Sequence, residues 1–123
     1  MSEIDFDGRR FRTVQNSDAG ESSSETVFRY RQKGSVVWAT YHGGNVSFGT
    51  LLARVVAGGR LEMVYQHLNK NGDFRTGRCR ARVEVLGDGR YRLHEFWEWT
   101  SGASGKGRSV TEEVPRRRGS PRP

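Results

Sequence analysis

The sequence predicts an all-β protein, an eight-stranded antiparallel up-and-down β-barrel. Turn signals rich in glycine recur at short intervals, and the segments between them alternate charged residues with small or apolar ones, as short strands do. No window repeats apolar residues at helical spacing. The 123 residues include 16 glycines and 3 prolines. Because glycine costs roughly 1 kcal/mol per helical position, this composition favours many tight turns over long helices.

Six turn signals divide the chain into predicted strands. Each signal contains glycine or asparagine, which tolerate the positive φ of hairpin turns, and they lie at 33–34, 43–45, 58–59, 69–73, 87–89 and 101–107. The predicted strands are 9–14, 25–32, 35–42, 46–56, 60–68, 74–86, 90–100 and 108–114. Gly49 and Gly77 lie inside two of them, where glycine often marks a bulge or a sharp bend. We expect residues 9–114 to form the barrel domain, residues 1–8 a flexible N-terminus, and residues 115–123 a disordered basic C-terminal tail.

Two predicted strands show which side chains face inward. In the strand at 74–86, charged residues occupy every second position and must face water. The small residues between them then point inward: Gly77, Cys79, Ala81 and Val83. The strand at 90–100 places on one face Leu93, Glu95, Trp97 and Trp99. Large indoles beside small residues fill a narrow barrel without overpacking, although a β-sandwich has the same local pattern and remains an alternative.

The net charge of +7 does not make nucleic acid the expected partner. Four arginines lie in the last nine residues, and without them the net charge is +3: Arg116, Arg117, Arg118 and Arg122. Single-stranded nucleic acids stack on aromatic residues interleaved with basic ones, whereas here the predicted inner face holds the tryptophans and the outer face the arginines. A weak polyanion contact through the tail remains an alternative.

The composition predicts a cytoplasmic protein that does not bind a membrane. The single cysteine, Cys79, excludes an internal disulfide framework and fits a reducing compartment. Neither a secretory signal pattern nor an apolar run of membrane-helix length is recognisable. An exterior coated with arginines also argues against an outer-membrane barrel.

Glu95 is the most informative single residue. It lies between Leu93 and Trp97 on the predicted inner face, where a carboxylate without a partner would be destabilising. One interpretation is structural: a hydrogen bond to a lumen tyrosine, or to an arginine that reaches in from a barrel end. The other is that Glu95 anchors a ligand, because binding pockets combine apolar walls with a few placed polar groups.

Aromatic residues accompany Glu95 on the inner faces of neighbouring predicted strands. They could bind a planar or cationic small molecule, or simply fill the core. His67 lies towards a strand end, where a barrel opens, and is therefore the better ligand candidate among them. The predicted ligand-binding residues of the barrel lumen are Glu95, Trp97, Trp99, Tyr65, His67 and Tyr41.

No catalytic residue, metal ion or cofactor is predicted. The histidines and the cysteine lack the paired spacing of zinc ligands, and Cys79 lies among small residues that suit a buried filler. The chain contains no phosphate loop, serine elbow or paired acidic motif. We therefore expect a protein that holds an unidentified small molecule rather than one that catalyses a reaction.

Several stretches resemble a family of small bacterial proteins with an avidin-like domain. The similarity covers roughly residues 8–114 and is most distinctive in Arg-Leu-His-Glu-Phe-Trp-Glu-Trp-Thr-Ser-Gly at 92–102. Other matching stretches lie at 25–30, 38–44, 49–51, 65–69 and 76–79. The resemblance implies an eight-stranded up-and-down barrel with a small-molecule mouth. It implies no particular ligand, since the biotin-binding residues of avidins do not map onto this sequence one by one.

Members of this family are often labelled N-acetylglutamate synthase, which makes an acetyltransferase the alternative function. Such enzymes bind the pyrophosphate of acetyl-CoA in a glycine-rich loop at a helix N-terminus, and this sequence shows neither. Avidin-like barrels also often self-associate, so a homo-oligomer is an open alternative. No exposed apolar stripe stands out along the sequence to locate an interface.

Overall fold

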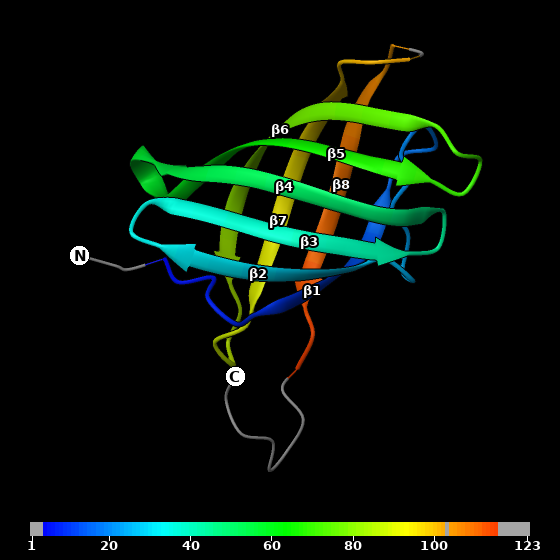
Figure 1. Cartoon of the computed structure of the whole chain (residues 1–123). Coiled ribbons are helices and arrows are strands. Elements are labelled where there is room, and N and C mark those ends of the chain that lie inside the picture. Colours follow the sequence, from blue (N-terminus) through cyan, green and yellow to red (C-terminus); the bar gives the residue numbers. More distant parts are fainter. Residues whose placement is uncertain (1–3, 103, 116–123) are drawn as a thin grey trace.

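The computed structural model describes residues 4–102 and 104–115. Its eight antiparallel strands follow one another around a closed barrel in chain order (Figure 1). They are β1 (Arg10–Asn16), β2 (Val27–Lys33), β3 (Val36–Gly43), β4 (Val46–Val56), β5 (Arg60–Asn69), β6 (Phe74–Val85), β7 (Tyr91–Trp99) and β8 (Lys106–Glu113). One short 3₁₀ turn, η1 (Ala57–Gly59), links β4 to β5. Among the described residues, no helix is long and apolar enough to span a membrane.

Closure of the barrel depends on the pairing of the first strand with the last. Phe11 pairs with Glu113 and Thr13 with Thr111 across β1 and β8. This ladder removes both sheet edges, which a sandwich would leave open. The predicted barrel is therefore confirmed, the sandwich alternative is wrong, and each predicted strand overlaps one observed strand.

The faces of β6 and β7 are those that the alternation predicts. Cys79 and Ala81 are buried on β6 while the arginines between and beside them are exposed. On β7, Trp97 and Trp99 keep only 7% and 8% of their surface exposed. Successive side chains of a strand point to opposite faces, so the charged residues reach water without interrupting the ladders.

Gly49 and Gly77 do not mark bulges, which were one of the two expectations for them. The register shifts of the sheet lie elsewhere, between Thr13 and Gln15 and around the β3–β4 turn. Tyr41 pairs directly with Gly49, and Tyr65 with Gly77. A Cβ atom at either glycine would collide with the tyrosine ring opposite. These glycines therefore make room for aromatic rings in the lumen.

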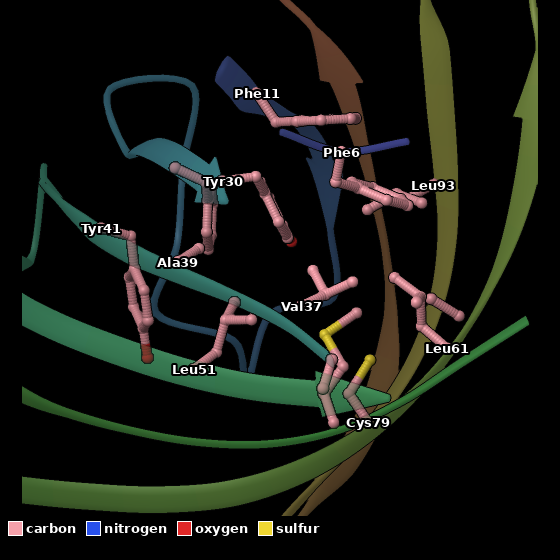
Figure 2. Close-up of a cluster of buried hydrophobic side chains, with 14 of the residues drawn as sticks. Phe6, Phe11, Tyr30, Val37, Ala39, Tyr41, Leu51, Leu61, Cys79 and Leu93 are labelled. Carbon is pink, nitrogen blue, oxygen red and sulfur yellow. The ribbon is translucent and has the colours of Figure 1, made fainter. Parts of the chain in front are cut away.

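One end of the barrel, here called the closed end, is filled by the segment before β1. Phe6 is fully buried, and its ring centroid lies 5.7 Å from that of Phe11, 5.1 Å from Tyr30 and 5.3 Å from Tyr91. The Phe6 amide donates to Gln32 Oε1 at 2.8 Å. Figure 2 shows Phe6 and Phe11 on the same side of the core as Leu93.

Residues 4–8 thus differ from the expected flexible N-terminus, because burying the Phe6 ring closes an opening that the strands alone leave. Residues 1–3 and 116–123, which include nearly all of the predicted basic tail, lie outside the described residues.

The outer face carries an apolar row that the sequence does not reveal. Trp38, Leu52 and Val64 are direct neighbours across β3, β4 and β5. All three are exposed. They come from three different strands, so only the register between strands brings them together.

Candidate binding site at the barrel mouth

The site lies at the end opposite Phe6, here called the mouth, where the connections β1–β2, β3–β4, β5–β6 and β7–β8 gather (Figure 1). A cavity of about 70 Å³ opens inside it. All six predicted lumen residues line this cavity: Glu95, Trp97, Trp99, Tyr65, His67 and Tyr41. The structure therefore brings the predicted set together around one space.

Aromatic rings from β2, β3, β5 and β7 line the cavity. The Trp99 ring centroid lies 5.5 Å from Trp97, 5.9 Å from Tyr65 and 5.8 Å from His67. The Tyr65 and His67 rings meet Trp99 nearly edge-on, an arrangement that the quadrupoles of aromatic rings favour. Tyr41 contributes from β3 and meets His67 edge-on. The wall is therefore a set of interlocking rings, each fixed by its neighbours.

Glu95 is held by two hydroxyl groups on β8. Ser109 Oγ donates to Glu95 Oε1 at 2.6 Å and Thr111 Oγ1 to Oε2 at 3.3 Å. The expected tyrosine or arginine partner is wrong, because the β7–β8 register places Ser109 directly opposite Glu95. Burial raises the pKa of Glu95, and the two hydroxyl hydrogen bonds offset this only in part. The carboxyl group is half-buried and borders the cavity.

The connection between β1 and β2, residues 17–26, folds over the mouth and is here called the lid. Its Ala19 carbonyl accepts from Trp99 Nε1 at 3.1 Å, and Asn16 Oδ1, just before the lid, accepts from Trp97 Nε1 at 3.0 Å. Asn16 Nδ2 also donates to the Ser22 carbonyl at 3.0 Å. Both lumen indoles therefore have their N–H groups satisfied by or beside the lid.

Glu21 of the lid meets three donors on the barrel wall. His67 Nε2 lies 2.7 Å from Glu21 Oε1, while Arg75 Nη1 and Asn69 Nδ2 lie 2.9 and 3.2 Å from Oε2. Burial by itself raises the pKa of Glu21, but hydrogen bonds from His67 and Asn69, together with the charges of His67 and Arg75, lower it overall. The carboxylate is therefore the favoured form.

Two further contacts orient this donor cluster. His67 Nδ1 lies 2.9 Å from Tyr41 Oη, so the two ring nitrogens of His67 are held between Tyr41 and Glu21. The Arg75 guanidinium carbon stands 4.0 Å above the centre of the Trp99 ring. Its Nε is buried without a hydrogen-bond partner among the described residues.

Three residues of this cluster were not among the predicted site residues: Glu21, Asn69 and Arg75. Glu21 lies in a serine-rich connection with no periodic pattern. Arg75, however, had a usable signal: it shares the inner alternation of β6 with Gly77 and Cys79. An arginine in an inward-facing position needs an anionic or aromatic partner.

The site offers neither an evident metal centre nor an activated nucleophile among the residues that the structure describes. No group of three or more histidine, cysteine, aspartate or glutamate residues is arranged there to hold a metal ion. Burial raises the pKa of the Cys79 thiol well above its ordinary value. Since the thiolate is the reactive form, this cysteine serves as a small filler of the core.

Comparison with known proteins supports the architecture. A family model described as avidin-like protein matches residues 4–114. The match starts in the segment that carries Phe6 and ends just after β8. Among curated proteins, none matches this chain.

Proposed function

Because the chain belongs to the avidin-like protein family, we propose that it is a non-catalytic barrel that binds a small molecule at its lidded mouth. The observation that carries this proposal is the cavity itself. Trp97, Trp99 and Tyr65 supply an aromatic wall, and Glu95 and His67 supply polar groups that point into the same space. Binding sites for small molecules combine these two features.

The size of the cavity indicates how a ligand enters. An engineered apolar cavity of about 150 Å³ in another protein holds benzene, and the present cavity measures about 70 Å³. A ligand larger than a few atoms therefore requires the lid to move. The barrel strands are locked in continuous ladders, whereas the lid is held over the cavity largely by side-chain contacts. Opening the lid therefore requires less energy than separating the strands of the wall.

The wall favours a ligand with a flat apolar body. Offset and edge-to-face contacts with rings such as Trp99 and Tyr65 stabilise planar groups by about 0.5–1.5 kcal/mol beyond the burial of their area. Glu95 borders the same space, and its carboxyl oxygens can hydrogen-bond with a polar atom of that body. A cytoplasmic location is part of the proposal, since the single cysteine is buried and forms no disulfide among the described residues.

Two of the three tryptophans test the proposed binding, one in the lumen and one on the outer face. Purified full-length protein is screened by thermal shift against a panel of metabolites that includes acetyl-CoA and glutamate, and binding is quantified by tryptophan fluorescence. We expect Trp99→Ala to weaken the ligand at least about tenfold, equivalent to roughly 1.4 kcal/mol. Trp38→Ala, which removes an outer indole, should leave the affinity unchanged.

Equal affinities of the two variants would contradict binding in the lumen. A thermal shift with acetyl-CoA accompanied by transfer of the acetyl group to glutamate would instead favour the acetyltransferase alternative.

A further inference from the structure

Glu21 is the one carboxylate in a cluster whose other members all belong to the barrel wall. His67 and Asn69 are inward residues of β5, and Arg75 is the inward residue that pairs with His67 on β6. Their donors converge on the two oxygens of Glu21: His67 donates to one, Arg75 to the other, and Asn69 lies within hydrogen-bond distance of both. The wall thus provides the donors and the lid provides the acceptor.

The wall donors are held in place by contacts that do not involve Glu21. Asn69 Oδ1 accepts from the amides of Asn71 and Asp73, both at 3.0 Å, which fixes the side-chain amide. Arg75 rests on the Trp99 ring, and His67 is held by Tyr41. A site whose donors are ordered before binding loses less entropy when it binds.

We propose that His67, Asn69 and Arg75 form a carboxylate-binding site that the lid residue Glu21 occupies in this closed conformation, and that the ligand's own carboxylate replaces Glu21 when the lid opens. This proposal rests on the proposed function and specifies its ligand class: a carboxylic acid whose flat body lies against the lumen rings. The aromatic floor of the cluster, Trp99, is shared with the cavity wall.

The donor set suits a monoanionic carboxylate. A carboxylate has two oxygens that accept in one plane, and a guanidinium group can serve it with two parallel N–H donors. Glu21, constrained by the lid, engages only Nη1 of Arg75 and leaves the buried Nε without a partner among the described residues. An untethered carboxylate can approach Arg75 more freely, including from the side where Nε and Nη2 present parallel N–H donors.

The test compares phenylacetate with phenylacetamide, which share a ring and differ in charge. Affinities are measured by tryptophan fluorescence on full-length wild type, Glu21→Gln, and the control Glu25→Gln, which alters an exposed lid carboxylate that forms no ion pair among the described residues. Circular dichroism verifies that each variant is folded. We expect Glu21→Gln to bind phenylacetate at least about tenfold more tightly than wild type does, and Glu25→Gln to match wild type.

A preference of the protein for the charged probe over the neutral one identifies the carboxylate site. In Glu21→Gln, phenylacetate should bind at least about tenfold more tightly than phenylacetamide, and adding Arg75→Gln should remove that preference. Equal affinity for the two probes, or a preference that survives Arg75→Gln, overturns the carboxylate site and leaves binding in the lumen standing.

Acetate separates the two proposals if neither aromatic probe binds. A melting temperature of Glu21→Ala that rises with sodium acetate, but not with sodium chloride at the same ionic strength, supports the carboxylate site and counts against an aromatic ligand in the lumen. The absence of any rise overturns the site.

Discussion

The two ends of this barrel are closed in different ways. At the closed end, Phe6 inserts among Phe11, Tyr30 and Tyr91, and the seal consists mainly of buried apolar surface. At the mouth, the lid is held by directional hydrogen bonds, above all those of Glu21. Apolar burial is non-directional and scales with area, so displacing the Phe6 ring would require a ligand of comparable apolar area. A hydrogen-bonded carboxylate can be replaced by another carboxylate, which makes the mouth the end suited to binding.

Two carboxyl groups in the same lumen show how the environment changes between these ends. Glu21 has a lowered pKa because His67, Asn69 and Arg75 outweigh the effect of burial. Glu95, deeper in the barrel, has a raised pKa because its burial outweighs the effect of two neutral hydroxyl groups. A negative charge is thus stabilised at Glu21 in the mouth and disfavoured at Glu95, deeper in the barrel.

Removing the apolar seal should have the largest effect on stability. We expect Phe6→Ala to lower the free energy of unfolding by about 3–5 kcal/mol, since the variant loses buried area and leaves a cavity. Urea denaturation measures the change. Phe74→Ala is the matched control, because this ring is 79% exposed, and it should stay within about 0.5 kcal/mol of wild type. Comparable losses in the two variants would show that residues 4–8 do not seal the barrel.

Filling the space that Gly77 leaves for the Tyr65 ring should lower the free energy of unfolding by an intermediate amount. The methyl group of Gly77→Ala collides with the Tyr65 ring, and overpacking of this kind costs about 1–3 kcal/mol. Gly87→Ala, where a Cβ atom meets nothing within 4 Å, is the control, again by urea denaturation. If both alanines are tolerated equally, the glycine does not hold the ring position open.

Glu95→Gln should change stability less than the other two substitutions, with its smallest effect at acidic pH. The change of this effect with pH tests whether a negative charge is disfavoured at Glu95. The folded pKa of Glu95 lies above the ordinary value of 4.5, so the ionised form is disfavoured in the folded protein. Stability from the neutral form is complete below about pH 4.5 and is lost as the pH rises through the raised pKa. Melting temperatures between pH 4 and pH 8 should therefore shift in favour of Glu95→Gln as the pH rises. A difference that stays constant over this range would contradict the raised pKa.

The sequence was sufficient for the eight strands and for most of the cavity wall, but its alternation fitted a sandwich as well as a barrel. Alternation in β6 and β7 separates the exposed arginines from Trp97 and Trp99 without knowledge of any neighbour, because the period of two is a local property of a strand. The same alternation places Arg75 inside, although the prediction did not use it. Gly77 was found but misinterpreted, since its role depends on the ring of Tyr65 on the adjacent strand.

What the sequence by itself determined is the direction in which each strand residue points, and with it the inward position of Glu95 and of the lumen rings. Only the tertiary structure decided which of those residues meet. Glu21 is 46 residues from His67 and 54 from Arg75 along the chain, and its lid has no repeating pattern. The lid takes its conformation from hydrogen bonds to β5, β6 and β7, which are far from it along the chain. The register of β3, β4 and β5 likewise decided that Trp38, Leu52 and Val64 share one outer row.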